Sequence, residues 1–380
     1  MGPVPSTRDR RFTDGRHVLV THPAPVAAWE EVLRADPTAM PFHTHRWLQS
    51  IEAATNWRDA TRLYELPDGR RLILLMVRRG GVRGMPVIQA SWPAGWGSGG
   101  ILAPGGVRPY EVAAVVSDLA GHAVSTRVRP AFGQTAAWAN AGIRVGSVCS
   151  TIHREVHLAR LTGTYDDYLS TRLSKSMRSH LRRAARNQQA AGLTVESGNS
   201  PELARDFYAV YTTWLRRRAT RRRIPAALAL WRGRNAEPWE RFLAVAENAG
   251  DDCRFSVASI AGRPVGGNVM LARGQIAVGW RAYSDHDVPG RLLISESLDM
   301  MDLEHAYERG CRYMELGESG GRQALANIKV RIGGFPHPFD EYRFERRSLT
   351  RLEAIYGASA TATDQLLTRT AAHIRNGRSE

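Results

Sequence analysis

The chain has 380 residues, of which 43% are hydrophobic and 23% charged, and its formal net charge is +15. These proportions are typical of a folded globular protein with one large or two medium-sized cores, and they exclude wholesale disorder. No run approaches the roughly 18 apolar residues of a membrane span, and the first residues, MGPVPSTRDRRF, lack the apolar segment of a signal peptide. Three scattered cysteines without a CxxC pair predict a cytoplasmic protein with no metal site.

The first half mixes short strands and helices. Apolar residues at helical spacing predict helices, and alternating or apolar runs bounded by PDG and GG turns predict antiparallel strands. The expected helices cover residues 29–35, 46–54 and 110–124. The expected strands cover residues 62–66, 71–78, 87–91 and 156–161, with a further strand at Val128.

A long helix is predicted from Tyr165 to about Ala191, where Gly192 ends it. Its apolar positions share one face and its cations share the opposite face, so the helix buries the first and exposes the second. The apolar positions are Leu173, Met177, Leu181 and Ala184, and the cations are Lys175, Arg178, Arg182 and Arg186.

Most of the excess positive charge lies in this region. Residues 172–234 hold 15 Lys and Arg but three Asp and Glu. A solvated helix face is the ordinary interpretation of a charge run, but such a face normally carries acids for (i, i+4) pairs, and none lies between Asp167 and Glu196. We therefore expect the helix to contact a polyanion. The second cluster, residues 216–223, fits either a phosphate-binding helix end or a mobile loop.

The second half predicts three antiparallel strands, a helix and a further strand. The strands cover residues 254–260, 264–272 and 275–283, joined by short hairpin turns. A helix over 291–309 and a strand over 311–316 then require a parallel crossover. Further helices are expected over 201–214 and 238–248 and in the tail over 349–374.

Both halves carry a similar α/β pattern, which suggests two related domains with mixed, mainly antiparallel sheets. The predicted division is a flexible tail (1–22), an N-terminal domain (23–161), a basic interdomain helix (162–196), a C-terminal catalytic domain (197–346) and a C-terminal helix with a tail (347–380).

Four segments in this order resemble the GNAT acyltransferase fold, and more closely its tandem form, the Fem-type aminoacyltransferases of peptidoglycan bridges. The segments are residues 41–48 (PFHTHRWL), 173–192 (LSKSMRSHLRRAARNQQAAG), 306–317 (AYERGCRYMELG) and 327–334 (NIKVRIGG), the last followed by Tyr342 and Arg343. The resemblance implies tandem GNAT-like domains that use aminoacyl-tRNA as the acyl donor.

The sequence departs from the GNAT pattern at the turn that binds coenzyme A. GNAT enzymes that use acyl-CoA carry a (Q/R)xxGx(G/A) turn whose backbone N–H groups bind pyrophosphate. Here the segment is DHDVPG, residues 285–290, in which two carboxylates and the proline oppose phosphate binding. Ile328 and Ile332 also replace two aromatic residues of the family around Lys329.

The resemblance assigns the catalytic lysine to Lys329, which would stabilise an oxyanion or a terminal phosphate. Glu315 and Glu318 at a strand end are candidates to bind or deprotonate the acceptor amine, although ion pairing explains Glu315 equally well. Candidate substrate contacts are Arg331, Tyr283, Asp285 and Trp96. The candidate tRNA contacts are Lys175, Arg178, Arg182, Arg183, Arg186, Arg216, Arg217, Arg221 and Arg222.

The sequence thus predicts a transferase that moves an aminoacyl group from tRNA to a small-molecule amine, without a redox cofactor or ATP. The acceptor would be a cell-wall precursor or a secondary metabolite. Two alternatives remain: an acyl-CoA-dependent N-acyltransferase, and a non-catalytic nucleic-acid-binding protein on a GNAT scaffold. The absence of GxSxG, HExxH and GxxxxGK[ST] motifs argues against a serine hydrolase, a zinc protease and a P-loop NTPase.

Overall fold

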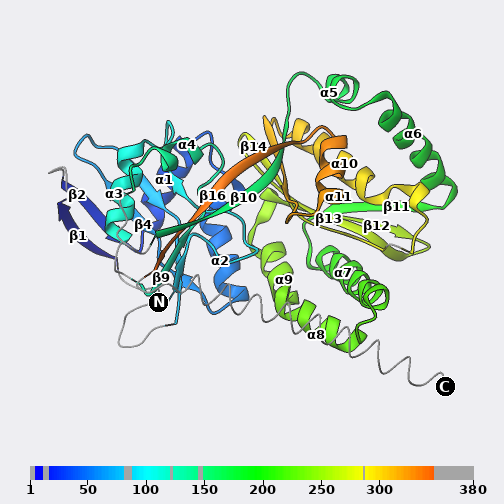
Figure 1. Ribbon diagram of the computed structural model, residues 1–380, viewed down its shortest axis with the longest axis horizontal. Coiled ribbons are helices and arrows are strands. Elements are labelled where there is room, and N and C mark those ends of the chain that lie inside the picture. The colour runs from blue at the N-terminus through cyan, green and yellow to red at the C-terminus, as the bar shows by residue number, and fades with distance from the viewer. Residues whose placement is uncertain are drawn as a thin grey trace.

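The structure, a computed structural model, describes residues 5–11, 17–80, 88–119, 123–143, 149–285 and 287–345 (Figure 1). Within these residues the strands form two sheets, and most neighbouring strands are antiparallel. One sheet has five strands in the order β1-β2-β4-β5-β8, and the other has eleven in the order β11-β12-β13-β14-β15-β10-β16-β9-β7-β6-β3. The predicted mixed α/β fold is confirmed.

The N-terminal half supplies the smaller sheet and one end of the larger one. Its strands are β1 (Ser6–Arg11), β2 (His17–His22), β3 (Arg58–Asp59), β4 (Arg62–Glu65), β5 (Arg71–Leu74), β6 (Val77–Arg79), β7 (Ile88–Ala90), β8 (Ile101–Leu102) and β9 (Ser125–Val128). Its helices are α1 (Val26–Ala35), η1 (Pro41–His43), α2 (His45–Ala54), α3 (Pro109–Leu119) and α4 (Thr135–Ala139).

The C-terminal half supplies the other end of the large sheet. Its strands include β11 (Leu193–Gly198), β12 (Cys253–Ile260), β13 (Arg263–Arg273), β14 (Ile276–Ser284) and β15 (Tyr313–Glu318). Its helices are α5 (Tyr165–Arg172), α6 (Lys175–Ala190), α7 (Pro201–Arg222), α8 (Ala226–Ala236), α9 (Trp239–Asn248), η2 (Gly250–Asp252), η3 (Gly290–Leu292), α10 (Ile294–Glu308) and α11 (Gln323–Arg331). The predicted meander (β12–β14), helix α10 and parallel strand β15 are all present.

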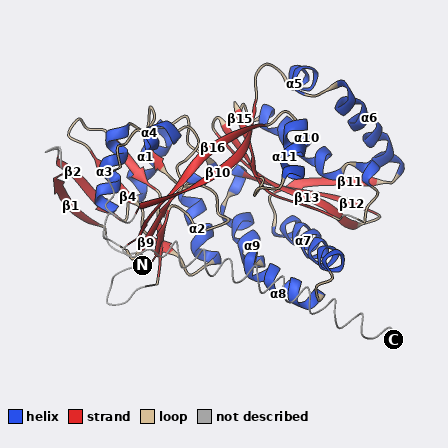
Figure 2. Cartoon of the chain, in the orientation of Figure 1, coloured by secondary structure: helices blue, strands red, loops and turns tan. Residues whose placement is uncertain are grey.

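Two long strands join the halves. β10 (Cys149–Arg160) and β16 (Phe335–Glu345) pair antiparallel along ten residues, and Figure 2 shows them crossing the middle of the molecule between two groups of helices. β10 also pairs with β15, whereas β16 pairs with β9. The large sheet is therefore continuous from one half to the other.

Three local predictions differ from the structure. The expected tail over residues 1–22 contains β1 and β2, which pair with each other and, through β2, with β4. The expected single helix over 165–191 is two helices, because Leu173 is extended and the Ser174 side chain accepts from the N–H of Met177 to cap α6. The predicted helix over 349–374 lies outside the described residues.

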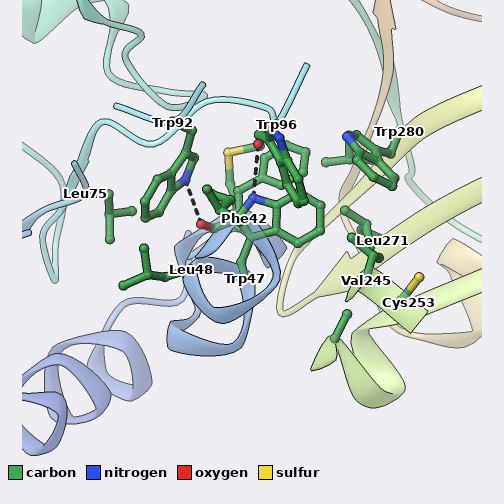
Figure 3. Close-up of a cluster of buried hydrophobic side chains, with 14 of the residues drawn as sticks. Phe42, Trp47, Leu48, Leu75, Trp92, Trp96, Val245, Cys253, Leu271 and Trp280 are labelled. Atoms are coloured by element: carbon green, nitrogen blue, oxygen red, sulfur yellow. Dashed lines mark hydrogen bonds between the residues drawn. The ribbon is translucent and has the colours of Figure 1, made fainter. Parts of the chain in front are cut away.

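The main core spans both halves. Trp47 of α2 packs edge-to-face on Trp96 and Trp280, with ring centroids 5.4 and 5.3 Å apart. Figure 3 shows this cluster, in which the indole N–H of Trp47 donates to the carbonyl of Trp96. Because these rings come from α2, a loop of the N-terminal half and β14, they fix that loop against the C-terminal half. No described helix is long and apolar enough to span a membrane.

Candidate functional site

The candidate site forms where β14 and β15 separate. The two parallel strands pair only from Ile276 to Val278 on β14 and from Tyr313 to Glu315 on β15. β14 continues to Ser284 and β15 to Glu318 without further pairing between them, so the strands diverge. Backbone groups on that side of β14 therefore face the resulting gap instead of a neighbouring strand.

A cavity of about 520 Å³ occupies this gap. β14 from Val278 to Tyr283 and β15 from Glu315 to Glu318 form its C-terminal walls, and Lys329 of α11 also lines it. Its N-terminal wall consists of Gly95, Gly97, Ser98 and residues 129–132. Both halves thus contribute to one pocket, which is the most common kind of place for a ligand site.

Lys329 lies on the helix α11, and its side chain is buried. Its ammonium group donates to the carbonyl of Gly317, 2.6 Å away. Burial lowers the pKa of Lys329 to about 8, although the carboxylates of Asp299 and Glu315 oppose this shift.

Glu315 lies on β15 beside this lysine. Burial, together with the nearby charge of Glu318, raises the pKa of Glu315 to about 7, while Lys329 and Arg129 act in the opposite direction. A carboxyl and an amine that both titrate close to neutral pH in one cavity are suited to proton transfer.

Glu318 belongs to a network of ion pairs. It forms ion pairs with Arg129 at 3.1 Å and Arg154 at 3.6 Å. Both arginines also bind Glu341 of β16, at 2.9 and 3.1 Å. Although burial opposes it, Arg129 and then Arg154 lower the pKa of Glu341 to about 2. This network connects β9, β10, β15 and β16 at the edge of the cavity.

A second buried pair of carboxylates lies behind Lys329, on α10. The amide of Asn268 on β13 donates to Asp299 and to Asp302, each at 3.0 Å. Burial raises the pKa of Asp299 to about 6 and that of Asp302 to about 7, and the Asn268 hydrogen bonds only partly offset it.

Of the four predicted substrate contacts, only Tyr283 lines the cavity. Arg331 is exposed and absent from the cavity wall, because α11 is helical and positions two residues apart do not share a face. Asp285 is buried in ion pairs with Arg217 at 3.7 Å and Arg263 at 3.4 Å. Trp96 is fully buried in the core cluster, so its glycine neighbours form the wall instead.

The loop that carries Gly95 and Gly97 is held in place by hydrogen bonds from β14. The carbonyl of Gly95 accepts from the indole of Trp280 at 3.0 Å and from the guanidinium of Arg281 at 2.6 Å. Glu237 in turn binds both Arg281 and Arg241. This side of the cavity is therefore preorganised.

The cations of α6 divide into two groups. Arg178 donates to the carbonyls of Leu169, Ser170 and Leu173, so it caps the end of α5 and is not free to bind a ligand. The others are exposed, and none forms an ion pair with a described residue; they are Lys175, Arg182, Arg183 and Arg186.

The cluster on residues 216–223 continues α7 by about two turns, so it forms a helix end, one of the two predicted alternatives, and not a loop. Arg216, Arg221 and Arg222 are exposed. Arg217 pairs with Asp287 at 2.5 Å, which makes it a link between α7 and the turn after β14.

Comparison with known proteins agrees with this architecture. Residues 175–323 match the family described as an acetyltransferase (GNAT) domain. The chain carries a GNAT domain. By enzyme class it is an acyltransferase. The separation of β14 from β15 lies inside the matched GNAT segment. No curated protein matches the sequence significantly.

Solved structures share the whole fold at low identity. FemX has a TM-score of 0.57 at 12% identity, with 82% of this chain and 95% of FemX covered. The C-terminal domain of a putative lysylphosphatidylglycerol synthetase from Agrobacterium fabrum has a TM-score of 0.50 at 12% identity, covering 87% and 95%. A conserved protein from Bacteroides thetaiotaomicron has a TM-score of 0.50 at 10% identity, covering 89% and 99%. The GNAT fold with a Fem-like architecture is thereby confirmed.

Several backbone N–H groups in the turn after β14 of the GNAT domain are already hydrogen-bonded within the protein. In the described part of this turn, the backbone N–H groups of Asp285, Asp287, Val288, Leu292 and Leu293 already donate to protein oxygens. Pro289 has no N–H. The donors that would bind pyrophosphate at such a turn are therefore reduced at these six positions, while the first turn of α10 keeps the unpaired N–H groups of a helix N-terminus.

Sequence reasoning missed Arg129 and Arg322, both of which line the cavity of the GNAT domain. Arg129 directly follows β9, and Arg322 directly precedes α11. A charged residue at the end of an apolar strand was a usable signal for Arg129. Arg322 had no such signal, because α11 was not expected. The described residues contain no cluster of three or more His, Cys, Asp or Glu that could hold a metal ion.

Proposed function

We propose that the protein is an aminoacyl-tRNA-dependent aminoacyltransferase that forms an amide bond on a small-molecule amine, either a cell-wall precursor or a secondary metabolite. The observation that carries this proposal is the adjacent pair of Glu315, with a pKa of about 7, and Lys329, with a pKa of about 8, in a cavity shared by both halves. Attack of an amine on an ester requires a neutral amine and a stabilised oxyanion, and this pair offers a base and a cation.

The reaction removes two protons from the acceptor nitrogen and exchanges one bond. Glu315 takes a proton from the acceptor ammonium, and the neutral amine attacks the ester carbonyl. Lys329 stabilises the negative oxygen of the tetrahedral intermediate. The ester C–O bond breaks as the amide forms, and the leaving ribose oxygen of the tRNA takes up the second proton, which the attacking nitrogen loses. The proton held by Glu315 then passes to solvent. The ester already carries the activation energy, so no ATP is required.

Positioning supplies much of the acceleration in this scheme. Effective molarity contributes up to about 7–11 kcal/mol when two reactants are well oriented. The bracing of the Gly95 loop by Trp280 and Arg281 supports a rigid acceptor wall. The exposed cations of α6, which lie on a helix without acids, support a polyanionic donor.

An acyl-CoA-dependent N-acyltransferase is the second candidate, and the match to an acetyltransferase domain favours it. The occupied N–H groups and Pro289 of the turn after β14 favour the tRNA-dependent reaction instead. Retention on a CoA-thiol column that resists salt would support the CoA-dependent candidate.

The proposal is tested by purifying the protein from its native cells and sequencing the RNA that accompanies it. We expect enrichment of one tRNA, which also identifies the aminoacyl group. Protein with Lys329→Ala should retain that tRNA but lose transfer. Recovery of no tRNA from the wild-type protein would overturn the proposal. Transfer that survives in Lys329→Ala would assign oxyanion stabilisation to another group, and tRNA binding without any transfer by the wild-type protein would leave the non-catalytic binding role.

A further inference from the structure

One wall of the cavity continues into an aromatic surface on α7. Tyr283, which lines the cavity, has its ring 4.6 Å from that of Tyr211 and 5.3 Å from that of Trp214. Trp214 is half-buried, so part of its indole remains accessible. The aromatic surface therefore begins inside the pocket and ends outside it.

Cations surround this surface. The guanidinium of Arg218 lies 5.0 Å from the centre of the Trp214 ring. Arg222 lies one turn along α7 from Arg218. Burial, followed by the charges of Arg222 and Arg322, lowers the pKa of Arg218. Arg322 itself lines the cavity. None of Arg218, Arg221, Arg222 and Arg322 forms an ion pair with a described residue.

We propose that Trp214, Arg218 and Arg322 form a rim of the cavity that binds one phosphorylated nucleotide end. The base would lie against Trp214, and the phosphate would lie between Arg218 and Arg322. The inference rests on the proposed function and deepens it, because it assigns the place where the donor enters the cavity. An aromatic ring flanked by arginines is the arrangement that holds single-stranded nucleotides, through stacking and charge.

The position of the rim distinguishes it from the cationic face of α6. α6 packs against η3 and the edge strand β11, which lies four strands from β15 in the sheet. At a spacing of about 4.8 Å, this places β11 about 19 Å from β15. No α6 cation lines the cavity, whereas Arg322 and Tyr283 border it together with Lys329.

Two donors share the required chemistry. The single-stranded 3′ end of a tRNA presents a base and phosphates, and the nucleotide of coenzyme A presents an adenine and phosphates. The rim would accept either one, so the probes must distinguish them.

The test measures binding of two short probes and one long probe to the full chain. The short probes are a labelled four-nucleotide single-stranded RNA and adenosine 3′,5′-bisphosphate, and the long probe is unfractionated tRNA. Arg218→Glu and Arg322→Glu should each weaken binding of the short RNA by about tenfold or more. Trp214→Leu should weaken it by about 5-fold to 150-fold, the range for loss of base stacking, and Trp214→Phe should restore most of it.

Arg205→Glu is the matched control. Arg205 is exposed on the same helix, and 13 residues along α7 correspond to about 20 Å from Arg218. Arg205→Glu introduces the same change in charge without altering the rim, so its affinity for the short RNA should remain within about twofold of the wild-type value. If a glutamate variant melts at a lower temperature than the wild-type protein, Arg218→Gln or Arg322→Gln is measured in its place.

The outcomes separate the two proposals. The rim site would be overturned if Arg205→Glu and Arg218→Glu weakened binding of the short RNA equally, or if the wild-type chain bound neither short probe. In either case, tRNA binding by the wild-type chain would leave the proposed function standing. Binding of adenosine 3′,5′-bisphosphate that depends on Trp214 and Arg218, without binding of RNA, would support the rim but overturn the tRNA-dependent function.

Discussion

Two side chains with opposite charges set the pH range in which the cavity can work. Glu315 must be ionised to accept a proton, which requires a pH above about 7. Lys329 must be protonated to stabilise an oxyanion, which requires a pH below about 8. Because the two requirements overlap over a narrow interval, we expect kcat/KM to follow a bell-shaped curve with its maximum between these values.

Single substitutions should remove one limb of this curve at a time. Glu315→Gln should lower kcat by about 10²-fold to 10⁴-fold, the usual contribution of a general base, and abolish the acidic limb. Lys329→Arg should abolish the alkaline limb, because a guanidinium stays charged. The measurement is kcat/KM from pH 5.5 to 9.5; an unchanged acidic limb in Glu315→Gln would assign the base to another group.

The buried carboxylates of α10 predict how stability depends on pH. The folded-state pKa of Asp302, about 7, lies above its ordinary value of 3.8, so the folded state binds a proton more tightly than the unfolded state. Stability is therefore lost as pH rises from about 4 through 7. Asp302→Asn keeps an oxygen for Asn268 and removes the buried charge, so it should raise Tm more at pH 8 than at pH 5. Melting curves at both values test this, and an equal shift at both would contradict it.

At the scale of the element, the loop above the tryptophan cluster depends on the lack of a side chain at Gly95. Gly95 has a φ of +83°, and a Cβ there would lie 2.8 Å from Arg241 Nη1 and 2.9 Å from Arg281 Nη2. Gly95→Ala should displace the arginines and raise KM for the acceptor. Gly106→Ala is the control, because Gly106 has a φ of +85° with no atom within 4 Å of its Cβ position. Equal effects of the two variants on Tm and KM would show that backbone strain alone matters.

The junction between α5 and α6 gives a second prediction at this scale. Arg178 donates to three carbonyls at the end of α5, so Arg178→Gln should lower the free energy of unfolding by about 1–3 kcal/mol. Arg182→Gln, on the exposed face of the same helix, should leave it within about 0.5 kcal/mol. Chemical denaturation of both variants measures the difference; equal stability would show that the cap contributes nothing.

At the scale of the whole molecule, the halves depend on each other for strand pairing. A fragment that ends at residue 161 retains β10 but loses its partners β15 and β16. β9 also loses β16. We expect this fragment to expose unpaired strand edges and to aggregate, whereas the full chain unfolds in a single transition. A soluble fragment with dispersed amide NMR signals would contradict this expectation.

The sequence predicts local elements better than it predicts their partners. The meander of β12 to β14 was predictable because each strand is short, apolar and closed by a tight turn. α11 was missed because its residues follow the glycines at positions 317, 320 and 321, which resemble a loop. The pairing of β10 with β16 joins residues almost 190 positions apart, as in the His153–Asp340 pair, and no local periodicity encodes it.

In the candidate site, too, local features were predictable and tertiary contacts were not. Lys329, Glu315, Glu318 and Tyr283 were identified because they end predicted strands or match a family segment, and all four line the cavity. The outward direction of Arg331 and the internal pairing of Arg217 and Asp285 depend on helix phase and tertiary contacts. Those properties arise only when the chain has folded.

The cavity has two walls of different origin, and this has an evolutionary consequence. The acid and the lysine belong to β15 and α11, whereas the Gly95 loop that faces them comes from the other half of the chain. Under the proposed function, mutations in that loop would alter which acceptor fits while leaving Glu315 and Lys329 untouched. Selectivity and reactivity can therefore diverge independently, so relatives that keep the same chemistry can acquire new acceptors through changes in the N-terminal half alone.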